Sequence, residues 1–189
     1  MNQDAVLDLF RQSHALLEGH FRLSSGLHSG AYLQCALVLQ HPRHAEALGR
    51  ALAAHTARAT VTAVLSPALG GVIIGHEVAR ALNVRAIFAE RQDGALMLRR
   101  GFSLAPSDRV FVIEDVVTTG GSTRETMAVA KAEGAHVVAA GAIIDRSGGV
   151  STMDVPFHAL ATLKVETYSL EQCPFCAAGK PIVKPGSRT

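Results

Sequence analysis

The feature of the sequence that most constrains the fold is a repeated order of short apolar run, small-residue loop and helix. Four apolar runs recur, at 61–65, 84–89, 109–113 and 136–144. Between them, 72–82 and 123–134 have the apolar spacing of helices. Parallel strands need long crossover connections, which are usually helical. The repeat therefore predicts an α/β fold with a central, mostly parallel sheet flanked by helices.

The length and the N-terminal pattern indicate how the rest is organised. A chain of 189 residues suits one well-cored domain, so we expect a single domain over 1–189. Segments 4–18 and 42–58 have helical patterns. Between them, 19–40 has Ser-Gly turn signals among short β-prone runs, which predicts a small irregular hood. A strand-like stretch at 158–170 leads into a polar C-terminal tail that we place with the hood.

One long segment interrupts the repeat. Residues 91–108 show no clear period, where βα units normally have short connections. Gly94 and Gly101 offer hinges within it. We expect a mobile loop here, with 93–107 forming a lid that excludes water from a reaction site.

The segment 109–125 carries the chemistry, and it reads RVFVIEDVVTTGGSTRE. An apolar strand ends in two carboxylates, Glu114 and Asp115, and a small-residue loop then leads into a helix. A glycine pair lets consecutive backbone amides converge, and the helix N-terminus adds its positive dipole end, so the loop can hold a phosphate monoester. Further donors are the hydroxyls of Thr118, Thr119, Ser122 and Thr123.

The acidic pair suggests what the phosphate is attached to. Carboxylates directly before such a loop can accept hydrogen bonds from sugar hydroxyls. The acidic pair and the loop together therefore suggest a binding site for ribose 5-phosphate. The alternative is an ordinary βα connection, because Thr-Gly pairs are common turn chemistry. The G-x-x-x-x-G-K-[ST] and G-x-G-x-x-G patterns are absent, so the loop is neither a Walker A nor a dinucleotide fingerprint.

The motif VFVIEDVVTTGGS closely resembles the phosphoribosyl diphosphate (PRPP) signature of the type I phosphoribosyltransferases. Other segments narrow the resemblance to the orotate phosphoribosyltransferases, namely GHFRLSSGLHSGAYLQ, SPALGG, FAER and AAGAIIDRSGG. The resemblance implies a pentosyltransferase that joins orotate to PRPP, giving orotidine 5-phosphate and pyrophosphate in pyrimidine nucleotide synthesis. It also implies Mg²⁺ as cofactor, bound mainly through PRPP, and a homodimer whose mobile loop reaches the neighbouring active site.

The resemblance also implies residue roles. Glu114 and Asp115 would engage the ribose hydroxyls, and with Arg91 they form the catalytic set. Thr118 and Arg146 would meet orotate, and Tyr32 would cover the base. The PRPP-binding positions would be Glu114, Asp115, Val116, Val117, Thr118, Thr119, Gly120, Gly121, Ser122 and Arg91.

Two of these roles have competing interpretations. A guanidinium suits bidentate capture of the orotate carboxylate, but Arg146 can also cap a strand end or pair with Asp145. Tyr32 can stack on the pyrimidine, or it can be a half-buried structural tyrosine.

The chain departs from the family pattern at several positions. Many relatives have Lys where this chain has Ser24, a Tyr-Lys pair at Leu69 and Gly70, and several Lys and a His in the long loop. Arg91, Arg99 and Arg100 can replace these cations. The alternative for Arg99 and Arg100 is a solvated charge pair in the loop. The departures leave open a purine-specific relative and a non-catalytic regulator that senses PRPP or a nucleotide.

Composition excludes other partners. Lys and Arg number 18 against 16 Asp and Glu, and a net charge of +2 is too weak for a surface that coats nucleic acid. The apolar stretches are short and the first residues are amphipathic rather than signal-like, so we expect a cytoplasmic protein without a membrane partner.

The cysteines are sparse. Cys173 and Cys176 form a C-x-x-C, for which zinc would need two more ligands from scattered histidines or a second chain. The nine histidines show no H-x-x-x-H or H-E-x-x-H pattern. We therefore interpret the tail as structural and assign no residue as a metal ligand.

Overall fold

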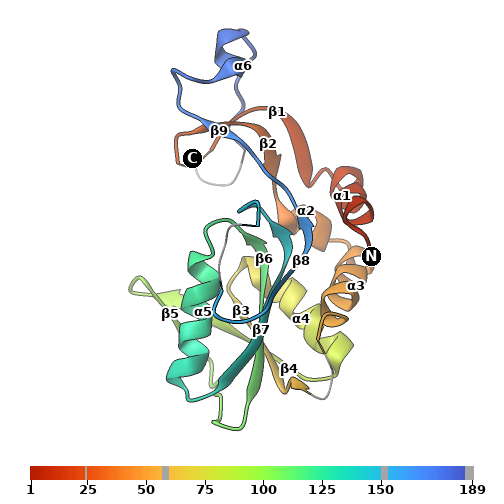
Figure 1. The fold of residues 1–189 in the computed structure, drawn as a ribbon, viewed down its shortest axis with the longest axis vertical. Coiled ribbons are helices and arrows are strands. Elements are labelled where there is room, and N and C mark those ends of the chain that lie inside the picture. Colours follow the sequence, from red (N-terminus) through yellow and green to blue (C-terminus); the bar gives the residue numbers. More distant parts are fainter. Residues whose placement is uncertain (24, 57–59, 150–152, 186–189) are drawn as a thin grey trace.

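A six-stranded sheet forms the body of the protein in the computed structural model, which describes residues 1–23, 25–56, 60–149 and 153–185. Its strand order is β5-β4-β3-β6-β7-β8 (Figure 1). The strands are β3 (Ala63–Pro67), β4 (Arg85–Gln92), β5 (Ala95–Leu98), β6 (Arg109–Val117), β7 (His136–Asp145) and β8 (Phe157–Thr162). Every neighbouring pair is parallel except β4 with β5. The predicted mostly parallel sheet is confirmed.

Helices cover both faces of this sheet. Helices α3 (Pro42–Ala53) and α4 (Gly70–Leu82) lie on one face, and α5 (Gly121–Ala132) lies on the other (Figure 1). Successive side chains of β6 point alternately to these two faces. Phe111 and Ile113 belong to the apolar cluster under α4, and Val110 and Val112 belong to the cluster under α5. Burial on both faces explains the continuous apolar run of this strand.

A second, smaller sheet stands above the body and forms the hood. It has the order β1-β2-β9 and is antiparallel, with β1 (Leu16–Arg22), β2 (His28–Leu33) and β9 (Thr167–Tyr168). The short helix α6 (Pro174–Ala177) follows β9, and the chain then returns to β1 (Figure 1). There the Val183 N–H donates to His20 O at 2.9 Å, and the Arg22 N–H donates to Val183 O at 2.9 Å.

The N-terminal prediction was wrong in its boundaries. Helix α1 (Gln3–Gln12) ends well before residue 18, because Ser13 Oγ donates to Leu9 O at 2.7 Å and His14 adopts a left-handed backbone with φ 54°. Leu16 then pairs with Leu33 across the hood sheet. Pairing with a distant strand outweighs the local helical spacing at this point.

The last part of the predicted hood belongs to the body. Helix α2 (Cys35–Leu39) lies within the range expected to be irregular, and it buries Cys35, Val38 and Leu39 in the main apolar cluster. Helix α3 ends at Ala53 rather than 58, and residues 57–59 lie outside the described part of the chain, as does Ser24.

The long interrupting segment also contains regular structure. Strands β4 and β5 form a hairpin whose turn residues, Asp93 and Gly94, have φ of 51° and 87°. Two positive φ values match the tight turn that follows the right-handed twist of paired strands. The expectation of a segment without period was therefore wrong for 91–98, since Asp-Gly is a strong hairpin signal.

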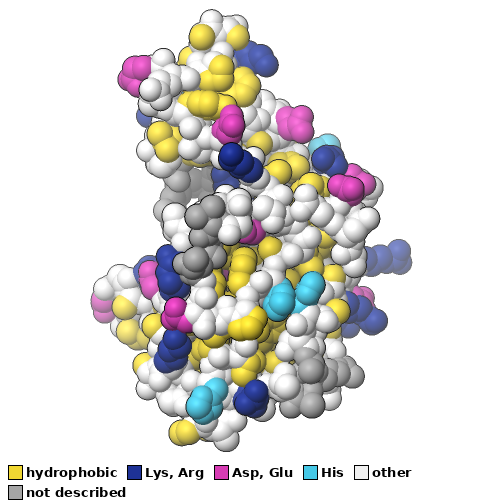
Figure 2. Space-filling view, viewed as in Figure 1, with side chains coloured by type: hydrophobic (Ala, Val, Ile, Leu, Met, Phe, Trp, Pro, Cys, Tyr) yellow, Lys and Arg dark blue, Asp and Glu magenta, His cyan; other side chains and the backbone are white. Residues whose placement is uncertain are grey.

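The surface carries both signs of charge. Figure 2 shows basic and acidic side chains interspersed over the face that it displays. No helix in the described ranges combines the length and the apolar character needed to span a membrane.

Candidate active site

A cavity of ≈ 210 Å³ lies where β6 gives way to α5, at the carboxyl end of the parallel strands. Gly120 precedes the helix with φ 76°, a left-handed conformation that glycine adopts without strain. This turn brings the first amides of α5 toward the cavity, where the helix dipole favours an anion. The lining residues are Glu114, Val116, Val117, Thr118, Thr119, Gly120, Gly121, Ser122, Thr123 and Glu125.

Thr123 supplies a spare donor to this cavity. Its side chain is buried, and its Oγ1 has no hydrogen-bond partner among the described residues. In contrast, Thr126 Oγ1 one turn later donates to Ser122 O at 2.8 Å. Leaving a buried hydroxyl unpaired costs about 1–3 kcal/mol. A phosphate oxygen in the cavity would remove this cost.

The two carboxylates have different surroundings. Glu114 is buried and Asp115 is half-buried, since neighbouring strand residues point to opposite faces. Glu114 Oε1 accepts from the Asp115 N–H at 3.2 Å, and Asp115 Oδ1 accepts from the Val116 N–H at 2.8 Å. Burial, followed by repulsion from Asp115, raises the pKa of Glu114 to about 9. The raised pKa favours the protonated form of Glu114 at neutral pH.

We expect Glu114→Gln to remove a pH dependence of stability. The folded state binds the extra proton between the ordinary pKa of 4.5 and about 9, so the wild-type free energy of unfolding falls as pH rises through this window. The slope is at most about 1.4 kcal/mol per pH unit. Thermal unfolding should be compared near pH 6 and near pH 9 without ligand. The stability of the Gln variant relative to wild type should be greater at the higher pH. Parallel pH profiles would contradict the assignment.

Asp115 also explains a departure from the family pattern. A Cβ placed on Gly70 would come within 2.8 Å of Asp115 Oδ2, so a side chain at position 70 would displace the carboxylate. Gly70 is the first residue of α4, whose positive end faces Asp115. The neighbouring Leu69 is 87% exposed. A lysine at position 70 would therefore require the Asp115 carboxylate to shift.

Arg146 lies beside the end of β6, because its N–H donates to Val117 O at 2.7 Å. Its Nε is buried without a partner among the described residues, and burial lowers its pKa. Asp145 instead accepts from the N–H groups of Ser147 at 2.7 Å and Gly149 at 3.1 Å. The ion pairs of the described residues do not include Asp145 with Arg146. The guanidinium keeps a donor for an anionic ligand.

Cys35 is a site neighbour that sequence reasoning missed. Burial, followed by the nearby charges of Asp115 and Glu114, raises the pKa of its thiol well above the ordinary value, while Arg146 acts in the opposite direction. These couplings place the start of α2 against the carboxylates. The sequence analysis did not place Cys35 near the site because it lies in 19–40, which was expected to be part of the irregular hood.

The remaining predicted residues lie at the rim or outside the cavity. Arg91 Nη2 donates to Glu125 Oε2 at 2.7 Å, which puts it at the cavity edge. Arg100 instead forms a two-pronged pair with Glu90 of β4 at 2.7 and 2.8 Å, and neither residue lines the cavity. Tyr32 packs against Phe21 with ring centroids 6.0 Å apart, and it does not line the cavity.

No family model matches the sequence. Comparison with individual proteins, in contrast, repeatedly finds orotate phosphoribosyltransferases. The chain is 52% identical over 188 residues to an orotate phosphoribosyltransferase from Pelotomaculum thermopropionicum, covering 100% of this chain and 99% of the relative. It is 53% identical over 191 residues to one from Heliobacterium modesticaldum, covering 100% of both.

Solved structures agree. Orotate phosphoribosyltransferase from Aeropyrum pernix has a TM-score of 0.71 at 25% identity, covering 84% of this chain and 94% of that one. The Mycobacterium tuberculosis protein of the same name has a TM-score of 0.69 at 20% identity, covering 84% and 96%, which supports the fold.

Proposed function

Because this chain belongs to the orotate phosphoribosyltransferase family, we propose that the cavity between β6 and α5 is its PRPP site. The protein is a pentosyltransferase of pyrimidine biosynthesis, which transfers the 5-phosphoribosyl group from PRPP to orotate and releases pyrophosphate. The observation that carries the proposed site is the buried Thr123 hydroxyl, which has no partner among the described residues, in a cavity lined also by the glycine turn and Glu114.

In this proposal the site works by positioning and charge. The amides of residues 118–122 and the Thr123 hydroxyl hold the 5-phosphate. Glu114 and Asp115 accept hydrogen bonds from the ribose hydroxyls. The ribose gains positive charge as the bond to pyrophosphate breaks, so carboxylates close to the ring stabilise the transition state. Such a reaction needs no protein nucleophile.

The donor set fits Mg²⁺, which prefers carboxylate and phosphate oxygens. Glu114 and Asp115 would hold it together with PRPP, which provides most of its ligands. The repulsion that raises the pKa of Glu114 is the kind that a cation relieves. When bound, Mg²⁺ neutralises the charge that develops on the leaving pyrophosphate.

We assign orotate to the side of the cavity near the end of β7. The buried Nε of Arg146 faces no acceptor in the described chain, so it is available to the carboxylate of orotate. Thr118, at the start of the loop, would contact the same base. Tyr32 would cover the base from β2, which leads directly into α2 and Cys35.

Other parts of the proposal concern assembly. We place the enzyme in the cytoplasm, which suits three free cysteines, without a nucleic-acid or membrane partner. We propose a homodimer in which the β4–β5 hairpin and the following loop reach the neighbouring site. The hairpin projects from the edge of the sheet (Figure 1) and carries exposed Met97. Arg99 follows β5 directly and is exposed, so it is a cation available to pyrophosphate.

The lid proposal gives a further expected result. Within the predicted lid at 93–107, Leu104 is buried and Phe102 packs against the apolar cluster under α5, so the lid is narrowed to the exposed part at 93–101. Amides of 93–101 should exchange rapidly with solvent in the free enzyme and slow on addition of Mg²⁺ and PRPP, because closure orders this segment over the leaving group. Hydrogen exchange measures both states, with buried β6 as the internal reference. Slow exchange in the free enzyme that PRPP leaves unchanged would contradict a lid.

The assignment of substrate is tested by pyrophosphate release from protein, Mg²⁺ and PRPP mixed with single bases. Release that depends on orotate is expected. Release only with a purine base would assign the site to a purine-specific enzyme. PRPP binding without release for any base would indicate a regulator, and either result overturns the substrate assignment.

A further inference from the structure

The interior of the hood is polar, which is unusual for a small sheet. Its buried side chains include His20, His28, Ser29 and Cys173, and Phe21 is the apolar one beside them. In the described chain, none of these five belongs to either apolar cluster of the body. Three short strands with so few buried apolar side chains of their own gain stability from a further cross-link, such as a metal ion.

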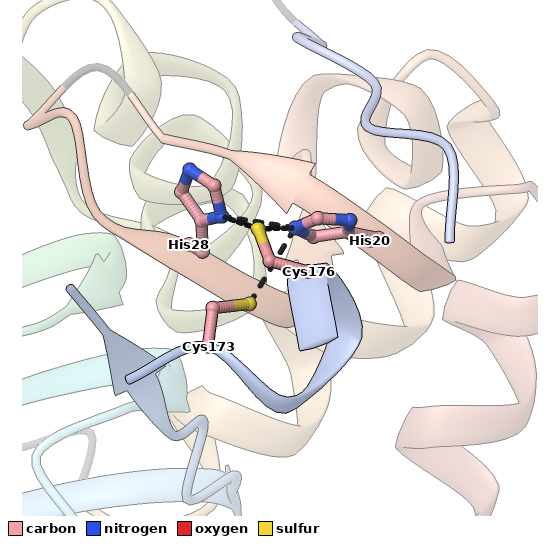
Figure 3. A group of neighbouring side chains, drawn as sticks. All are labelled: His20, His28, Cys173 and Cys176. Atoms are coloured by element: carbon pink, nitrogen blue, oxygen red, sulfur yellow. Dashed lines mark hydrogen bonds between the residues drawn. The ribbon is translucent and has the colours of Figure 1, made fainter. Parts of the chain in front are cut away.

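Four of the hood's side chains converge on one point (Figure 3). His20 comes from β1, His28 from β2, and Cys173 and Cys176 from the tail around α6. Their ligand atoms all lie within 4.8 Å of one another. The first three side chains are buried, and Cys176 is half-buried.

The individual distances suit a tetrahedral ion. Zn–N and Zn–S bonds of ordinary length separate a nitrogen and a sulfur ligand by about 3.6 Å, and two nitrogen ligands by about 3.3 Å. His20 Nε2 lies 3.5 Å from Cys173 Sγ and 3.6 Å from Cys176 Sγ. His28 Nδ1 lies 3.2 Å from Cys176 Sγ and 2.9 Å from His20 Nε2. These four distances differ from the ideal values by at most a few tenths of an ångström, and the two remaining pairs of ligand atoms lie within 4.8 Å.

The ring of His20 is oriented as a ligand. Its Nδ1 lies 2.9 Å from Lys180 O, and a carbonyl oxygen can only accept, so Nδ1 carries the proton. The lone pair of Nε2 therefore points at the other three ligand atoms. A backbone carbonyl on the outer ring nitrogen is the usual support of a metal-bound histidine.

We propose that His20, His28, Cys173 and Cys176 bind one structural Zn²⁺. Binding releases the two thiol protons to solvent, and two thiolates then neutralise the charge of the ion. Four protein ligands leave no open position, which distinguishes a structural site from a catalytic one. A groove of ≈ 530 Å³ beside Cys176 gives the ion a path into the site.

The ion would fasten the C-terminal tail to the hood. The cysteines lie about 150 residues beyond the histidines in the chain, so one ion closes a very long loop. The fastened strand β2 continues toward Tyr32 and α2. Zinc therefore stabilises the part of the protein that stands above the proposed orotate position.

Metal analysis of the full chain, produced with zinc in the medium, tests the site. We expect one zinc per chain, and Co²⁺ exchanged into the same protein should give the visible absorption and thiolate charge-transfer bands of a tetrahedral site. Cys176→Ser and His28→Gln should each weaken zinc binding more than about 100-fold. Cys35→Ala and His136→Gln are the matched controls for each residue type, and both should retain zinc.

Thiol counting on the wild-type protein keeps the proposal falsifiable if a variant does not fold. Because Cys35 is buried in the body, all three cysteines should resist a thiol reagent in the metal-loaded protein. Two should become reactive when a chelator removes the metal, with a fall in melting temperature on removal. A chain that binds neither zinc nor Co²⁺ stoichiometrically would overturn the proposal. So would a disulfide between Cys173 and Cys176, or zinc binding that both site variants retain.

Discussion

Asp115→Asn is expected to lower kcat by about 100- to 1000-fold while leaving the fold intact. The substitution removes a charge aimed at the ribose and at Mg²⁺. It preserves shape, since an amide oxygen can still accept the Val116 N–H that Asp115 Oδ1 accepts at 2.8 Å. The neutral side chain also keeps its place against Gly70. Pyrophosphate release gives kcat, and thermal unfolding verifies the fold.

Asp154→Asn is the matched control. Asp154 lies on the surface, where it pairs with Lys131 at 3.4 Å, so its loss should leave kcat unchanged. A near-normal rate in the folded Asp115 variant would contradict the role of this carboxylate and with it the proposed ribose 5-phosphate site.

Arg146→Ala should weaken orotate binding by about 2–5 kcal/mol, the range for removing one partner of a buried charge pair. PRPP binding should change little, because Arg146 lies at the end of β7 and the 5-phosphate loop follows β6. Lysine should restore only part of the loss, since it keeps the charge without the planar fork. Dissociation constants for orotate and for PRPP, measured on wild type and both variants, separate these effects.

Uracil provides the ligand control for this series. It lacks the carboxylate, so wild type should discriminate strongly against it and the Ala variant should discriminate weakly. Unchanged orotate affinity in Arg146→Ala would show that another group holds the carboxylate.

The sheet and the phosphate loop were predictable from sequence because their signals are local. The apolar run of β6, its acidic pair and its glycine turn are adjacent in the chain, and a parallel sheet buries both faces of its strands. The strand proved longer than 109–113, running to Val117, so the carboxylates belong to the strand itself.

The hood could not be predicted in the same way, because its structure depends on pairing between residues that are far apart in the sequence. Leu16 has helical spacing with the residues before it, and only its pairing with Leu33 makes it a strand. His20 and His28 have no metal signature in sequence, because their potential co-ligands are about 150 residues away. Cys35 and Gly70 likewise meet Asp115 only in the folded protein.

A crystal structure of the protein with Mg²⁺ and PRPP tests the proposed PRPP site most directly. We expect the 5-phosphate within hydrogen-bonding distance of the amides of 118–122 and of Thr123 Oγ1, with the ribose hydroxyls at Glu114 and Asp115. A 5-phosphate bound elsewhere, with Thr123 Oγ1 still without a partner, would contradict this expectation.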